Sequence, residues 1–100
     1  MASLTPEEIY QKLLAADVVP EVQPIIDALR AAGGFSSQAT SLIRRMQKDE
    51  SFRQSWNGSM FKELGRSYGL SWEETFGLLA ASMMLHPKTP WTGERIRVGS

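Results

Sequence analysis

Residues 71–87 read SWEETFGLLAASMMLHP and contain a helix together with the signals for both of its ends. Ser71 and Glu74 have the spacing of a capping box, in which the two side chains bind free N–H groups of the first helical turn. The run from Phe76 to Leu85 is rich in apolar residues, and Pro87 ends the helix because proline cannot donate the next backbone hydrogen bond. Side chains spaced three or four residues apart share one helix face, and here they are Trp72, Phe76, Leu79 and Met83. This segment predicts one helix with that face buried.

The same order of start signal, apolar face and stop signal recurs upstream of residue 71. A capping box starts the first helix at residues 5–8, the second begins between residues 21 and 24 and stops at Gly33-Gly34, and the third starts at residue 36 or 37. A short fourth segment follows Asp49 and is interrupted at residues 57–58, and a further helical stretch over residues 60–68 ends at Gly69. Before residue 94 nothing alternates with the two-residue period of a strand. We therefore predict an all-α fold, a compact bundle of about five short helices with an irregular C-terminal tail.

A tail that contains proline and glycine sets the predicted domain boundary. We expect residues 1–86 to form the helical domain and residues 87–100 to form the tail. Because an indole is costly to leave in water, Trp91 is expected to pack back onto the helices. The alternative is that residues 91–98, which include an alternating run from Glu94 to Val98, form an extended arm that adds to the sheet edge of a partner.

Composition is that of one globular domain, and it excludes several chemistries. One hundred residues, 42% of them hydrophobic and 22% charged, suffice for one hydrophobic core. The chain has no cysteine, which excludes disulfides, thiolate nucleophiles, zinc ribbons and iron–sulfur clusters. Residues 1–5 lack the features of a secretory signal, and the longest apolar-rich run is about half of the roughly 20 residues that a membrane span needs. We therefore expect a cytoplasmic protein with no membrane contact.

The residues do not predict an enzyme. The single histidine, His86, lies at the expected end of the last helix, where a polar or cationic group suits the free carbonyls. Neighbouring carboxylates occur at residues 7–8, 49–50 and 73–74, all in first helical turns, where the helix dipole favours negative charge. Phosphate-binding, dinucleotide-binding and calcium-binding motifs are absent from the sequence. We predict no catalytic residue, no cofactor and no metal site.

Charge is unevenly distributed along this neutral chain. Residues 1–27 hold five acidic side chains against one lysine, a balance of −4, whereas residues 28–66 hold seven basic against three acidic side chains, a balance of +4. If the third and fourth helices pack side by side, the basic residues after residue 43 form one patch. The candidate partner-binding residues are that patch and three residues of the tail: Arg44, Arg45, Lys48, Arg53, Lys62, Arg66, Trp91, Arg95 and Arg97.

The leading functional prediction is a small non-catalytic protein–protein interaction module, meaning an accessory subunit, adaptor or inhibitor that acts by occupying a surface. Three tryptophans and five methionines accompany the uneven charge, and aromatic residues, methionine and arginine are enriched at interfaces. The expected partner is another protein, in particular an acidic one. A homodimer is a further option, because Gly77 and Ala81 permit the close approach of two helices, within a chain or between chains.

Nucleic-acid binding is the alternative function. It would use either the basic helical face of Arg44, Arg45 and Lys48 or residues 61–79, which resemble a helix-turn-helix unit. In that unit Gly65 occupies the position that favours a small residue. The unit departs from the usual pattern in the acidic start of its second helix, where a DNA-reading helix would carry cations.

Residues 42–87 also resemble the helical small-subunit domains of extradiol ring-cleaving dioxygenases, the alpha chains of those enzymes. The shared features are a basic helix, an Asp-x-x-x-Arg turn at Asp49 and Arg53, Gly69-Leu70-Ser71 and the closing His86-Pro87. This resemblance implies an accessory subunit that covers the active site of another chain.

Overall fold

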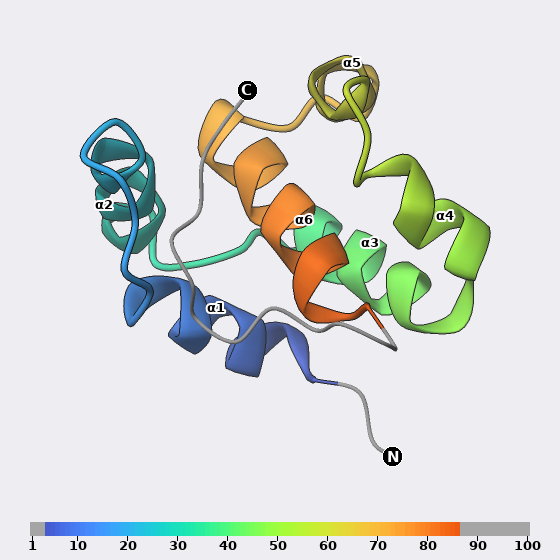
Figure 1. Cartoon of the computed structure of the whole chain (residues 1–100), viewed down its shortest axis with the longest axis horizontal. Helices are drawn as coiled ribbons and strands as arrows, with labels where there is room; N and C mark the ends of the chain where they lie inside the picture. Colours follow the sequence, from blue (N-terminus) through green and yellow to red (C-terminus); the bar gives the residue numbers. More distant parts are fainter. Residues whose placement is uncertain (1–3, 87–100) are drawn as a thin grey trace.

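The computed structural model describes residues 4–86, and these residues form six helices (Figure 1). The helices are α1 (Pro6–Leu14), α2 (Gln23–Ala31), α3 (Ser37–Lys48), α4 (Glu50–Ser55), α5 (Phe61–Ser67) and α6 (Trp72–Met84). The predicted all-α fold is confirmed. The number is one more than the expected five because the short segment after Asp49 forms a helix of its own, separated from α5 at the predicted interruption. The tail, with the predictions for its boundary and for Trp91, lies outside the described residues.

The predicted start signals are the observed N-caps of four helices, namely Thr5, Ser36, Asp49 and Ser71. At α1 the capping box is complete: the Glu8 N–H donates to Thr5 Oγ1 (3.1 Å), and the Thr5 N–H donates to Glu8 Oε1 (2.9 Å). The hydrogen bond from the Thr5 backbone is the main reason that the pKa of Glu8 lies below its ordinary value, and the Thr5 side chain lowers this pKa further.

The capping box at α6 forms only in part. The Glu74 N–H donates to Ser71 Oγ (3.3 Å), as predicted. The Glu74 carboxylate, however, accepts a hydrogen bond from the backbone N–H of Ser36 (2.7 Å), a residue far away in the sequence. Glu74 therefore links the start of α6 to the start of α3.

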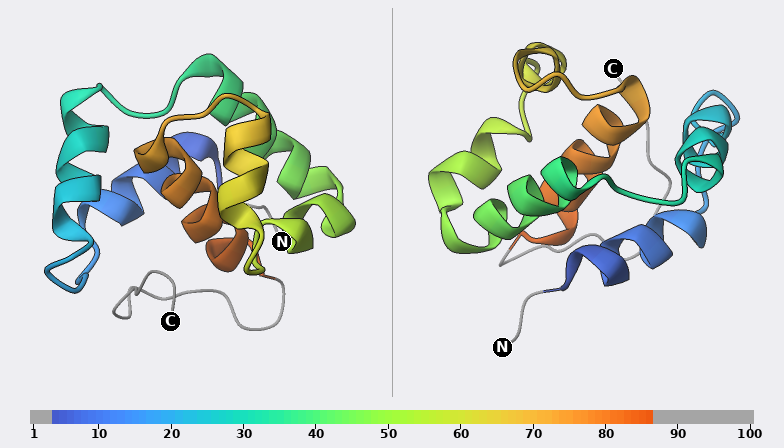
Figure 2. Two further views of the ribbon diagram at one scale, coloured as in Figure 1. Left: turned by 90° about the horizontal axis from the view of Figure 1, so that it is seen from above. Right: turned by 180° about the vertical axis from the view of Figure 1, so that it is seen from behind.

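Helix α6 lies at the centre of the bundle and contacts α1, α2, α3 and α5 (Figures 1 and 2). Residues 75–78, 80–82 and Met84 are buried, so this helix is covered on nearly every side. The prediction of one buried face is wrong in part, because Leu79 and Met83 are half-buried whereas Leu78 is completely buried. Four neighbouring helices enclose α6, and burial therefore does not follow a single stripe.

Trp72 is exposed, and the prediction that it is buried is wrong. Its side chain is 40% exposed, although Phe76, one turn later, is completely buried. Trp72 is the first residue of α6, and helical side chains point toward the helix N-terminus, which here lies beyond the core. The indole packs against Phe61 of α5, with ring centroids 5.9 Å apart.

Two glycines allow other elements to approach α6 closely. A Cβ atom at Gly77 would lie 2.4 Å from Cε1 of Phe35, and one at Gly65 would lie 2.1 Å from Oγ1 of Thr75. Gly77 and Ala81 are both buried within the chain, so their small size serves packing inside this molecule. In residues 4–86, no helix combines the length and apolar character needed to cross a membrane.

Candidate functional site

One face of α3 presents three cations to solvent. Arg44, Arg45 and Lys48 are exposed, while Ala39, Leu42, Ile43 and Met46 on the opposite side are buried in the core. Helical spacing brings the three cations onto neighbouring positions of one side of the helix. We call Arg44, Arg45 and Lys48 the α3 basic face.

This basic face has no acidic counterpart on its own helix. The sequence of α3, SQATSLIRRMQK, contains no aspartate or glutamate. The ion pairs found in residues 4–86 join Asp27 to Arg30 and Glu50 to Arg53, both at 3.5 Å, and neither involves the α3 basic face. Within the described part of the chain, the three charges are therefore not neutralised by ion pairs.

Helix α3 is held at both of its sides. The Gln47 side-chain amide donates to the backbone carbonyl of Leu4, ahead of α1. The Gln38 side-chain amide donates to the carbonyl of Tyr68 at the end of α5 (2.8 Å). These two bonds, together with the buried apolar side, fix the direction in which the basic face points.

Arg45 is also held by an aromatic cluster. Its guanidinium carbon lies 4.0 Å from the ring centroid of Phe52 on α4, a cation–π arrangement worth about 0.5–1 kcal/mol at an exposed site. Phe52 packs edge-on against Trp56 (6.1 Å) and Tyr68 (6.4 Å), and Trp56 stacks on Tyr68 (6.0 Å). The indole N–H of Trp56 is buried without a hydrogen-bond partner among the described residues. One cation of the α3 basic face is thus positioned by the aromatic cluster.

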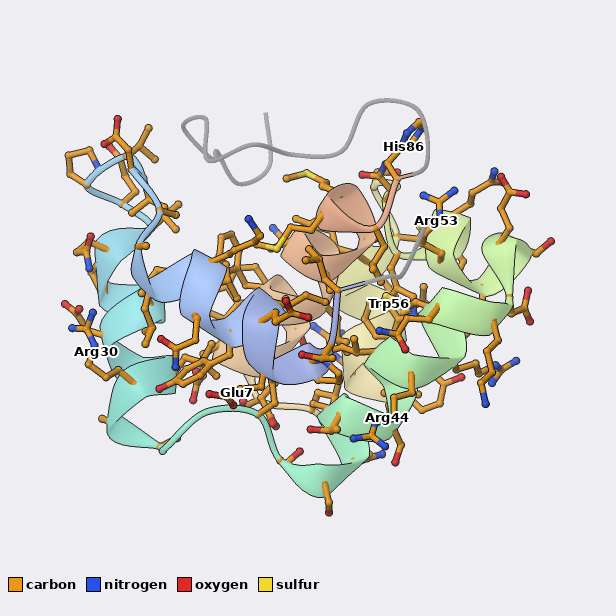
Figure 3. All side chains as sticks on the ribbon, turned by 90° about the horizontal axis from the view of Figure 1, so that it is seen from below. Glu7, Arg30, Arg44, Arg53, Trp56 and His86 are labelled. Atoms are coloured by element: carbon orange, nitrogen blue, oxygen red, sulfur yellow. The ribbon has the colours of Figure 1, made fainter. Side chains whose placement is uncertain are left out.

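Arg53 is not part of the exposed basic surface, and the prediction that it belongs there is wrong. Its side chain is only 5% exposed, with Nη1 3.5 Å from the backbone carbonyl of Ser82 and Nη2 3.5 Å from Glu50. Arg53 lies on the inner side of α4, beside the buried Phe52, and is directed toward α6. Arg44 and Arg53 are well separated in Figure 3.

Lys62 and Arg66 are exposed on α5, one helical turn apart. The Lys62 ammonium lies 5.5 Å from the ring centroid of Trp72, so this cation is placed beside the start of α6. The six middle-region cations are therefore divided into three on α3, one buried and two on α5. Trp91, Arg95 and Arg97 lie outside the described residues.

A pocket of about 270 Å³ adjoins the α3 basic face. Its walls are the start of α1, the loop before α3 and one side of α3, with the lining residues Thr5, Pro6, Glu7, Tyr10, Gly33, Gly34, Phe35, Thr40 and Arg44. Arg44 belongs to both the pocket and the basic face, and Glu7 of α1 lines the same pocket (Figure 3). Sequence reasoning does not find this pocket, because its walls come from three separate segments and the two glycines are explained equally well as a helix stop.

The helix-turn-helix-like segment is an interior element of this fold. Its second helix is α6, which contacts four other helices, and its glycine, Gly65, packs against Thr75. A recognition helix must instead expose one side to enter the major groove. Its acidic start is also occupied, because Glu74 is bonded to Ser36. This burial argues against residues 61–79 as a nucleic-acid reader.

Among residues 4–86, no group of three or more histidine or carboxylate side chains is arranged to hold a metal ion. Comparison of the chain with protein-family models, with curated proteins and with solved structures gives no match. The resemblance of residues 42–87 to dioxygenase alpha chains therefore stays a prediction, and the function is argued from the geometry of the α3 basic face and its pocket.

Proposed function

We propose that this chain is a small protein–protein interaction module, and that its α3 basic face docks an acidic segment of another protein. The observation that carries the proposal is the set of three exposed cations on one helix that has no acidic residue and no ion pair to them within residues 4–86. Accessory subunit, adaptor and inhibitor are all roles that such surface occupation can serve.

The fixed position of the basic face favours binding. Ordering a long side chain at an interface costs about 0.5–1.5 kcal/mol, and the stacking of Arg45 on Phe52 removes part of this cost in advance. Exposed ion pairs contribute only about 0–1 kcal/mol each. Three such pairs support a weak, salt-dependent complex in which charge mainly accelerates the encounter.

An acidic protein fits this face better than a nucleic acid does. The three cations fall within five residues of α3, a rise of about 6 Å along the helix axis. Strong non-specific binding to a duplex uses about 6–10 phosphate contacts spread along the backbone. The whole chain is neutral as well.

The test compares two triple variants that lose the same charge. Arg44→Gln, Arg45→Gln and Lys48→Gln remove the α3 basic face, whereas Lys12→Gln, Arg30→Gln and Lys62→Gln remove three exposed cations elsewhere. Fluorescence anisotropy would measure the affinity of a labelled glutamate-rich peptide, and of single-stranded and duplex oligonucleotides, at low and physiological salt.

We expect the peptide to bind the wild type and to lose about tenfold in affinity with the first variant, the result of three lost pairs of about 0.5 kcal/mol each. The second variant should bind nearly as the wild type does. Equal weakening by both variants would show that only net charge matters. A preference for the oligonucleotides over the peptide would overturn the proposal in favour of nucleic-acid binding.

A further inference from the structure

We infer that the pocket beside the α3 basic face receives one uncharged aromatic or aliphatic side chain of the same acidic segment, an inference that rests on the proposed function. The partner would then be a short acidic stretch with a single hydrophobic anchor. Its acidic residues would lie over Arg45 and Lys48, and its anchor would enter between α1 and α3.

Continuity between pocket and basic face is the first reason. Arg44 lines the pocket and is also one of the three cations of the basic face. A segment whose carboxylates lie along α3 therefore reaches the edge of the pocket at Arg44. The partner does not need a second, separate contact surface to reach it.

The pocket has a mixed lining, with a contiguous apolar part on which an anchor would rest. Pro6, Tyr10 and Phe35 supply apolar surface, with the two rings in edge contact at 6.1 Å. Phe35 packs against α6 at Gly77, which has no side chain and so leaves room for the phenyl ring. The absence of a side chain at Gly34 leaves the Tyr10 ring open toward the pocket. A preformed wall lowers the ordering cost of binding.

Size favours one side chain over a whole small molecule. The pocket is an open depression of about 270 Å³, just under the lower end of the range of about 300–1,000 Å³ that is typical of small-molecule sites. Interface hot spots are commonly single aromatic side chains that fill such a depression, surrounded by polar contacts that exclude water.

The charges at the rim determine the chemistry of the anchor. Glu7 lies on the α1 side of the pocket and Arg44 on the α3 side. An acidic anchor would be attracted by Arg44 but repelled by Glu7, and a cationic anchor would be attracted by Glu7 but repelled by Arg44, so the rim favours neither sign of charge. A neutral side chain avoids both costs, and the hydroxyl of Thr40 offers a partner to a tyrosine or tryptophan.

The experiment uses the full chain and two labelled peptides that are identical except at one position, phenylalanine in one and alanine in the other, within the same glutamate-rich sequence. We expect the phenylalanine peptide to bind about tenfold to a hundredfold more tightly by fluorescence anisotropy, the range of a buried anchor side chain. Replacing Thr40, which lines the pocket, by leucine should abolish this preference. Ser37→Leu, on the same helix outside the pocket, should leave it unchanged.

Each outcome decides between the two proposals. Equal affinity for the two peptides in the wild type would overturn the anchor and leave the basic face intact. A preference that survives Thr40→Leu but disappears in Trp72→Ala would place the anchor on the exposed indole instead of in the pocket. Failure of both peptides to bind would overturn the proposed function and the anchor with it. The first comparison needs no variant, so it stands even if a substitution impairs folding.

Discussion

Replacing Gly77 by alanine tests how tightly the loop before α3 packs on the central helix. The added Cβ would lie 2.4 Å from Cε1 and 3.0 Å from Cζ of Phe35, so the ring must move by about 1 Å to regain normal contact. Overpacking of this kind costs about 1–3 kcal/mol. Alanine returns about 0.5–1 kcal/mol through its better helix propensity. We therefore expect the free energy of unfolding to fall by roughly 1–2 kcal/mol.

Thermal and urea denaturation followed by circular dichroism would measure this loss. For a domain of this size, each kcal/mol corresponds to about 4–8 °C in Tm, so the expected decrease is roughly 4–16 °C. Gly58→Ala is the matched control, because nothing lies within 4 Å of a Cβ at that position and its φ is not positive. The control should be neutral or slightly stabilising.

A double-mutant cycle makes the reasoning refutable. If the clash with Phe35 causes the loss, Phe35→Leu combined with Gly77→Ala should be less destabilised than the two single variants together. Strict additivity, or a Gly77→Ala protein as stable as the wild type, would show that Phe35 does not pack against α6 in this way. The assignment of Phe35 to the pocket wall would then be wrong as well.

Two further predictions concern a buried cation and a helix cap. Arg53→Ala should lower the free energy of unfolding by about 1–3 kcal/mol, because the Ser82 carbonyl loses its donor and a packed side chain is removed. Arg44→Ala at the surface should change the free energy of unfolding by less than about 0.5 kcal/mol. Urea denaturation would measure both values. Equal effects would contradict the burial of Arg53. Since the pKa of Glu8 is lowered in the folded state by its bonds to Thr5, the capping box stabilises the fold above the ordinary glutamate pKa and loses this contribution as pH falls through the lowered value. Glu8→Gln should therefore weaken the acid dependence of Tm between neutral pH and pH 3, and an unchanged pH profile would exclude this role.

Local chemistry explains why the helices could be predicted. Thr5, Ser36, Asp49 and Ser71 are observed N-caps, and the break at residues 57–58 separates α4 from α5. A cap or a turn depends on groups three or four residues apart, all of which are visible in the sequence. The identity of α3 as a basic helix follows in the same way from its composition.

The burial of individual side chains and the position of the pocket depend instead on which helices lie next to each other. Trp72 is exposed because α6 begins beyond the core, and Arg53 is buried because α4 turns that side toward α6. Glu74 binds Ser36 instead of completing its own capping box. The pocket exists only where α1, the loop before α3 and α3 itself meet. A helical pattern specifies which side chains share a face, but burial depends on what packs against that face, and this is set by segments distant in the sequence.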